Sequence, residues 1–224
     1  MFAAPLQYER QTEPRSCGAA ALTMVYRSLG ITCNQEDIWQ VVASKSAYGA
    51  QCARAQTLAK DALDRGLRAL AFQVRDPWIV LERCLHDSVR VIINHAPASA
   101  PTGGHYSVLT DLNDREIIFH DPSEGPNQAV SRRAFLLLWN PRSPFAEILG
   151  QVMIAIAASE SKLESCLLCK GQARDVVKCR SCRRQVRLQP LAILGCLTDW
   201  CPMRGWEQIF CPWCDHTWTK GLGA

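Results

Sequence analysis

The sequence predicts an α+β fold, with a larger domain of helices followed by an antiparallel sheet, and then a small cysteine-rich domain. Segments with helical periodicity come first and short strand-like segments follow them, which is typical of the α+β class. Eight of the twelve cysteines are concentrated in residues 166–214. A small and polar stretch precedes them. We therefore predict domains over 1–158 and 166–218, joined by a linker at 159–165.

Three segments near the start have the helical pattern, at residues 18–29, 35–43 and 53–65. In the first of these, apolar side chains recur three or four residues apart, and Gly30 ends the pattern. Asn34 can cap the second helix, and Gly66 ends the third. These segments account for the helical half of the predicted fold.

The segments after Gly66 have mostly strand character. We expect strands at 67–74, 89–95, 105–111, 116–120 and 151–157, with helices at 76–86 and 131–138. Asn113 and Asp114 form a turn between two of these strands, which indicates an antiparallel hairpin. Ser131 can cap the last helix.

Composition and charge narrow the classes of protein to consider. Apolar residues make up 48% and charged residues 21%, as in ordinary globular domains. Residues 1–158 hold 15 basic and 15 acidic side chains, so the net charge of +4 lies in the tail and gives little reason to expect nucleic-acid binding. No signal-peptide pattern and no apolar run of roughly 20 residues is present, so we expect no membrane span and a cytoplasmic location. In a reducing cytoplasm, cysteines serve as metal ligands, catalytic groups or buried thiols.

A cysteine stands where the first helix is predicted to begin, in the segment QTEPRSCGAAALTM at residues 11–24. The first-turn N–H groups and the helix dipole favour a thiolate at Cys17, and the thiolate is the reactive form. Gly18 and the alanines after it leave space for a substrate backbone. Gln11 can donate its side-chain amide to an oxyanion, together with the backbone N–H of Cys17.

A histidine and an aspartate occupy matching positions on the predicted hairpin. His105 opens one strand directly after two glycines, where it can point into a cleft and accept a thiol proton. Asp121 follows the end of the next strand, so the hairpin brings it close to His105. It can then orient the imidazole and stabilise its cation. The order of residues predicts a Cys17–His105–Asp121 triad.

These motifs together resemble a known family. Gln…Cys-Gly-x-Ala-x-Leu-x-Met, Gly-His-Tyr-x-Val-Leu and Asp-Pro are similar to the papain-like cysteine peptidases that process bacterial bacteriocin leader peptides after a double glycine. The resemblance covers roughly residues 5–157. It implies a papain-like fold, with Gln11 as oxyanion donor, Cys17 as nucleophile, His105 as base and Asp121 as orienting residue. Two features depart from the family: Ser16 stands where an aspartate is usual, and nothing resembles the transporter that is often fused to these peptidases.

Plainer interpretations of single residues were weighed against this one. A lone cysteine at a helix start is usually a small buried residue, but three groups in the right order and local context favour a reactive centre. His95 and His120 are alternative bases, although neither opens a strand after glycines. Cys33, Cys52 and Cys84 lie in or beside helical patterns, and we interpret them as buried thiols.

Eight cysteines in the tail have the spacing of metal ligands. Three C-x2-C pairs and one C-x4-C pair are present, and two such pairs complete a tetrahedral shell for zinc. We therefore predict two structural Zn²⁺ sites. The predicted ligands are Cys166, Cys169, Cys179, Cys182, Cys196, Cys201, Cys211 and Cys214.

The spacing also bears on which cysteines share an ion. Residues 169, 179 and 182 recur 32 positions later as 201, 211 and 214, as in a tandem repeat. This favours contiguous sites, one within 166–182 and the other within 196–214, and a crossed arrangement is the alternative. His216 could replace a cysteine in the second site. We expect the tryptophans at 200, 206, 213 and 218 to form the core of this small domain.

The leading hypothesis is a papain-like cysteine peptidase that acts on a peptide or protein, with a zinc module that recruits a substrate or protein partner or stabilises the chain. An acyl transferase with the same cysteine centre is an alternative, because the acceptor alone distinguishes the two reactions. A non-catalytic peptide-binding adaptor is a third possibility.

Overall fold

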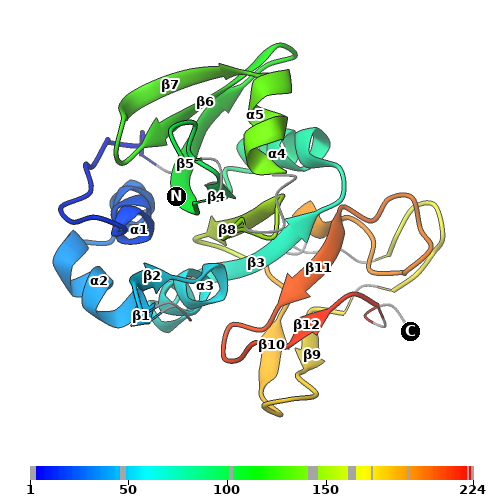
Figure 1. The fold of residues 1–224 in the computed structure, drawn as a ribbon. Coiled ribbons are helices and arrows are strands. Elements are labelled where there is room, and N and C mark those ends of the chain that lie inside the picture. Colours follow the sequence, from blue (N-terminus) through cyan, green and yellow to red (C-terminus); the bar gives the residue numbers. More distant parts are fainter. Residues whose placement is uncertain are drawn as a thin grey trace.

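The computed structural model describes residues 4–45, 49–100, 103–140, 146–160, 165–172, 174–190, 192–220 and 222 (Figure 1). The helices are α1 (Cys17–Ser28), α2 (Gln35–Val42), α3 (Ala55–Asp64), α4 (Pro77–His86), α5 (Arg132–Trp139) and the short 3-10 helix η1 (Ala192–Leu194). The longer strands are β3 (Arg68–Val74), β4 (Arg90–His95), β5 (His105–Leu112), β6 (Glu116–Asp121), β7 (Gly125–Ser131), β8 (Val152–Ala157) and β11 (Trp206–Phe210). The short strands are β1 (Ala43–Lys45), β2 (Gln51–Ala53), β9 (Val176–Lys178), β10 (Gln185–Arg187) and β12 (Thr217–Trp218).

One large sheet organises the described part of the chain. Its eight strands follow the order β12-β11-β3-β8-β4-β5-β6-β7, and every neighbouring pair is antiparallel. The predicted α+β class is confirmed. Among the described helices, none is both long and apolar enough to cross a membrane.

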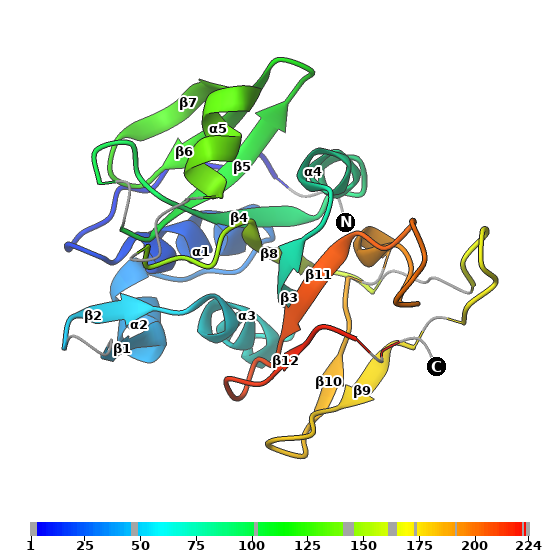
Figure 2. The ribbon, with the colours of Figure 1, turned by 45° about the vertical axis from the view of Figure 1, so that its right-hand side comes forward.

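The sheet separates two hydrophobic cores because successive strand residues point to opposite faces. On β3, Leu70 and Phe72 belong to one core, whereas Ala69 and Ala71 belong to the other. Residues of α1, α2 and α3 pack in the second core, while α4, α5 and much of the cysteine-rich segment pack in the first (Figure 2). Helix α1 therefore covers the face of the sheet that contains Ala69 and Ala71.

Most elements begin and end where the sequence predicts. Asn34 caps α2 by accepting a hydrogen bond from the backbone N–H of Asp37 at 2.8 Å, and Ser131 caps α5 through the N–H of Ala134 at 3.3 Å. The third helix begins at Ala55 rather than residue 53, because 51–53 form β2. Strand β7 was not predicted, because its first residues are the turn-forming types Gly, Pro and Asn.

The cysteine-rich segment is joined to the main sheet. Strand β11 pairs with β3, and Ile209 lies opposite Phe72 in the register. Strands β9 and β10 form a separate hairpin. Trp206 and Trp218 are buried as expected, but Trp200 is 73% exposed, so its predicted place in the core is wrong. Within the predicted linker, residues 161–164 lie outside the described residues.

Candidate functional site

Cys17 is the first residue of α1, and a network of hydrogen bonds fixes the loop that precedes it. The Ser16 hydroxyl is buried and donates to the carbonyl oxygen of Glu13 at 2.9 Å. The side chain of Gln35, from α2, contacts the same loop: its Oε1 accepts from the Thr12 N–H at 2.8 Å and lies 3.2 Å from the Ser16 hydroxyl. Ser16 therefore has a buried polar role at the position where the resembling family usually has an aspartate. No local pattern identifies Gln35, because it lies 18 residues along the chain from Cys17 in a separate helix.

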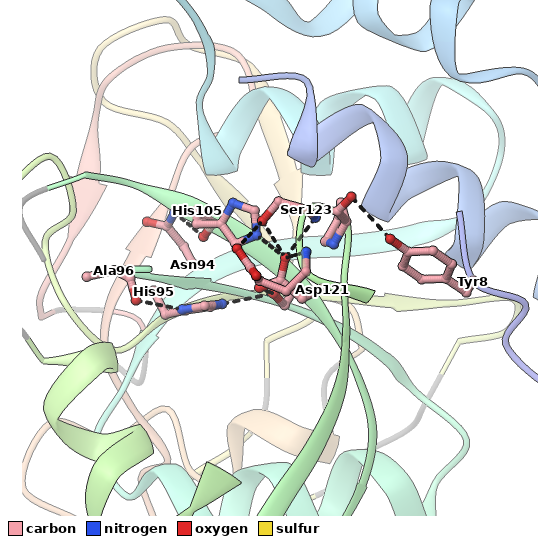
Figure 3. A network of polar contacts seen from close by, with 10 residues as sticks. Tyr8, Asn94, His95, Ala96, His105, Asp121 and Ser123 are labelled. Atoms are coloured by element: carbon pink, nitrogen blue, oxygen red, sulfur yellow. Dashed lines mark hydrogen bonds and ion pairs between the residues drawn. The ribbon is translucent and has the colours of Figure 1, made fainter. Parts of the chain in front are cut away.

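His105 and Asp121 meet at the ends of β5 and β6. The Nε2 of His105 lies 2.8 Å from the Oδ1 of Asp121, and both side chains are buried. Oδ1 also accepts from the backbone N–H and the hydroxyl of Ser123, at 2.8 and 2.9 Å (Figure 3). Burial alone raises the pKa of Asp121, but the hydrogen bonds from His105 and Ser123 outweigh it and hold that pKa well below its usual range.

The other partner of His105 is the Cys17 thiol. Burial lowers the pKa of His105, but hydrogen bonds to Asp121 and to Cys17 outweigh this effect and raise the pKa to about 10. The imidazole can therefore hold a proton at neutral pH. The fold brings together the three residues of the predicted triad.

The two alternative histidines have other partners. His120 accepts from the backbone N–H of Asn127 at 3.1 Å. His95 lies behind Asp121: its Nε2 is 2.9 Å from the Ser107 hydroxyl, which is 3.4 Å from the Oδ2 of Asp121 (Figure 3). Burial lowers the pKa of His95 to about 4, with the neighbouring His105 as a second cause, so His95 is neutral at pH 7.

Gln11 lies beside the third residue of the triad. Its backbone N–H donates to the carbonyl oxygen of Pro122 at 3.0 Å, and Pro122 directly follows Asp121. Its side-chain Oε1 is buried and has no hydrogen-bond partner. The backbone of Gln11 is thus fixed beside the residue that follows Asp121.

A cleft of about 290 Å³ opens onto Cys17. Glu147 lines it and connects its two sides: one carboxylate oxygen lies 3.0 Å from the Arg15 guanidinium, and the other accepts from the Gly104 N–H at 3.0 Å. Glu147 was not predicted as a site residue, because it is a lone acidic residue after the last predicted helix.

The scattered cysteines differ from the prediction in part. Cys84 is buried, as predicted, whereas Cys33 and Cys52 are only partly buried. Cys52 also lines the cleft that contains Cys17. Its interpretation as a buried thiol beside the third helix is wrong, because the short strand β2 places it at the cleft.

The eight tail cysteines gather in two groups of four, and the grouping is crossed. The first cluster is Cys166, Cys169, Cys196 and Cys201, and the second cluster is Cys179, Cys182, Cys211 and Cys214. The predicted contiguous grouping is wrong, because each C-x2-C knuckle of the first half faces a pair from the second half. His216 is not part of either group.

The geometry of the clusters fits a tetrahedral thiolate site. Sulfur–sulfur distances are 3.7 and 3.5 Å in the first cluster and 3.6 and 3.8 Å in the second. Four sulfurs at ~2.3 Å from a zinc ion lie roughly 3.8 Å apart, whereas a disulfide needs ~2.05 Å. Backbone N–H groups of Gly171 and Thr198 point at Cys169 and Cys196, as they do in knuckles that stabilise thiolates.

Comparison with known proteins assigns the larger part of the chain. Residues 6–142 match the profile of the peptidase C39 family, which is more than half of the 224 residues. The chain belongs to the peptidase C39 family. It is therefore a cysteine peptidase, as the motifs predict, and the matched region of this C39 peptidase contains the predicted triad. The cysteine-rich segment lies outside that region.

Two solved structures share the fold of this C39 peptidase. The peptidase domain of Streptococcus ComA, a bi-functional ABC transporter involved in quorum sensing, aligns with a TM-score of 0.50 at 14% identity over 71% of this chain and 100% of that one. A C39-like peptidase from Bacillus anthracis aligns with a TM-score of 0.50 at 15% identity, over 70% of this chain and 96% of that one. A double glycine motif protease from an AMS/PCAT transporter, solved in complex with the leader peptide, aligns with a TM-score of 0.49 at 19% identity. The alignment covers 70% of this chain and 94% of that one. A comparison with curated proteins finds no match.

Proposed function

We propose that this C39 peptidase cleaves a peptide or protein through Cys17, His105 and Asp121. The observation that carries the proposal is the buried His105–Asp121 pair at 2.8 Å, whose imidazole pKa is also raised by the thiol of Cys17, a residue that lines the cleft. Each group has the local setting its role needs: a helix start for the thiolate, a proton-holding imidazole, and a carboxylate held ionised by its own hydrogen bonds.

The reaction follows from these positions. The Cys17 thiolate attacks the scissile carbonyl carbon, and the carbonyl oxygen becomes an oxyanion that the Cys17 N–H and the Gln11 amide stabilise. The C–N bond then breaks, and His105 gives its proton to the leaving amine. Water attacks the resulting thioester while His105 takes one of its protons, which releases the carboxylic acid and regenerates the thiolate. Asp121 remains ionised throughout and keeps Nε2 of His105 occupied, which leaves Nδ1 for proton transfer.

The proposed substrate has two glycines before the scissile bond. Membership of the C39 family and the resemblance of the Cys17, His105 and Asp121 motifs to double-glycine leader peptidases support this specificity.

The two cysteine clusters are proposed to hold one structural Zn²⁺ each. Four thiols at the separation that zinc requires, with backbone N–H groups directed at two of the sulfurs, support this assignment. The ions would join residues 166–182 to residues 196–214, and they take no part in the proposed reaction.

The test compares Cys17→Ala with Cys52→Ala, because both cysteines line the same cleft. With an internally quenched peptide that contains Gly-Gly, we expect Cys17→Ala to lower kcat/KM by about a thousandfold or more and Cys52→Ala to leave it nearly unchanged. Replacing Gly-Gly by Ala-Ala in the peptide should abolish cleavage. Turnover by Cys17→Ala would refute the proposal, and mass spectrometry of the products would reveal acyl transfer as an amine adduct.

A further inference from the structure

The cysteine-rich segment contributes directly to the cleft that contains Cys17. Phe210, the last residue of β11, lines this cleft together with Ile148, Leu149 and Val152. Phe210 immediately precedes Cys211, a member of the second cluster. Phe210 lies outside the region matched by the C39 family, and it forms part of the wall of the cleft that contains Cys17.

The alternation of β11 explains why Phe210 points this way. Ile209 and Cys211 are fully buried in the core that contains α4, whereas Phe210 packs against the core that contains α1 and Cys17. Successive residues of a strand face opposite sides, so burial of Ile209 and Cys211 fixes Phe210 toward the cleft. The pairing of Ile209 with Phe72 on β3 sets the register of this arrangement.

A second contact attaches the same segment to the rim of the cleft. The carboxylate of Asp215 lies 2.8 Å from the Arg54 guanidinium and accepts from the Gln56 amide at 3.2 Å, and both partners are cleft residues. Asp215 directly follows Cys214 of the second cluster. The cleft wall is therefore anchored by residues that directly precede and directly follow the Cys211–Cys214 pair of that cluster.

The charges at the rim are already paired. Arg54 is paired with Asp215, and Arg15 is paired with Glu147. The surface between these pairs includes Phe210 and the apolar side chains near it. A peptide side chain that enters this space meets apolar atoms and no unpaired charge from these groups, which favours an apolar residue over a charged one.

We propose that Phe210 determines substrate specificity by binding an apolar side chain of the peptide, and that the second cluster holds Phe210 in place. This inference rests on the proposed function of Cys17, because the peptide reaches Phe210 only when it is bound for attack by that thiolate. The C39 domain alone would then lack one wall of its own binding site.

Covalent labelling of Cys17 tests the inference without a known substrate. The probes are two epoxysuccinates, one with a leucyl arm on each side of the epoxide and one with glutamyl arms, so that both directions of the cleft are sampled. The thiolate attacks an epoxide carbon, the C–O bond breaks, and the alkoxide takes a proton from His105. Rates are measured at Cys17 by site-resolved mass spectrometry, which separates it from Cys52, and iodoacetamide serves as a probe of the thiolate alone.

We expect the parent protein to react faster with the leucyl probe than with the glutamyl probe. Phe210→Ala should reduce the leucyl rate by about tenfold, while iodoacetamide labelling is unchanged. Phe210→Arg should shift the ratio of the two rates toward the glutamyl probe by about tenfold or more. Because both rates come from one sample, partial unfolding cancels in their ratio. Trp200→Ala, an exposed aromatic residue of the same segment, is the control and should leave the ratio unchanged.

The two cysteine clusters provide a further comparison. Cys214→Ser, in the second cluster, should lower the preference for the leucyl probe, and Cys169→Ser, in the first cluster, should not. An unchanged ratio in both Phe210 variants would overturn the inference. Absence of labelling at Cys17 by every probe, iodoacetamide included, would instead refute the proposed function.

Discussion

The Asp121 carboxylate fixes the state of the proposed catalytic pair. Its Oδ1 contacts His105 and receives hydrogen bonds from the backbone N–H and hydroxyl of Ser123. These contacts hold Asp121 ionised, and the ionised carboxylate in turn helps His105 to keep its proton. The charge state of the centre thus depends on a turn of a few residues after β6.

This coupling predicts how stability changes with pH. Burial lowers the pKa of His105, but its hydrogen bonds raise it from 6.5 to about 10, so its stabilising contribution is full below about pH 6.5 and is lost as the pH rises through 10. The lowered pKa of Asp121 adds stability that is lost only in strong acid. We expect Asp121→Asn to lower Tm by about 10 °C at pH 6.5 and by much less at pH 10. Thermal unfolding of the parent protein and of Asp121→Asn between pH 6.5 and pH 10 measures this difference. An equal decrease in Tm at both pH values would contradict the prediction.

Sequence motifs predicted the triad but not its supports. Cys17, His105 and Asp121 each have a local signature: a helix start, a glycine-preceded strand and a strand end. Gln35, Ser107 and Glu147 act through contacts with segments that are distant along the chain, so no local pattern identifies them. The roles of the triad residues in catalysis stay predictions until the variants are measured.

At the scale of elements, the proposed site requires that the start of α1 and the start of β5 keep a fixed separation. Glu147 connects them through Arg15, two residues before Cys17, and Gly104, the residue before His105. Arg15 has a positive φ of 69°, which is uncommon for a residue with a side chain and indicates that its neighbours hold it in place.

Removal of this connection should impair catalysis more than folding. We expect Glu147→Ala to lower kcat by about tenfold, since a small displacement of the reacting groups costs rate. Iodoacetamide labelling of Cys17 in the same variant should change less than turnover, because a small electrophile needs no alignment with a bound peptide. Glu82→Ala, an exposed residue on α4, is the matched control for loss of a carboxylate. Equal kcat values for both variants would show that Glu147 does not align the two elements.

The order of elements was predictable because caps and strand patterns are local. The position of strand β11 in the main sheet was not predictable, because its partner β3 lies more than a hundred residues earlier in the chain. Its sequence, WEQIF, lies among cysteine knuckles, where spacing suggests a separate repeat. Pairing across that distance depends on burial of Ile209 and Trp206 against the main core, which only the folded chain shows.

At the scale of the whole molecule, the crossed clusters tie the two ends of the cysteine-rich segment together. Each cluster takes one pair from residues 166–182 and one from 196–214. The tandem-repeat spacing favoured contiguous sites, but spacing alone reports the local knuckles and not which knuckles face each other. If zinc fills the clusters, the free energy of zinc binding contributes directly to the free energy of folding of this segment. Loss of metal would then release β11 and β12 from the edge of the main sheet.

Two double variants distinguish crossed from contiguous sites by metal content. Cys166→Ser with Cys201→Ser removes two ligands from the first cluster only, so we expect one zinc per chain, compared with two in the parent protein. Cys166→Ser with Cys179→Ser removes one ligand from each cluster, and we expect both sites to lose most of their affinity. Native mass spectrometry counts the zinc ions bound to each chain. The control variant Cys33→Ser, which changes a cysteine outside the clusters, should retain both zinc ions. In a contiguous arrangement the two results would be exchanged: Cys166→Ser with Cys179→Ser would keep one zinc, because the four downstream thiols would still form a complete site.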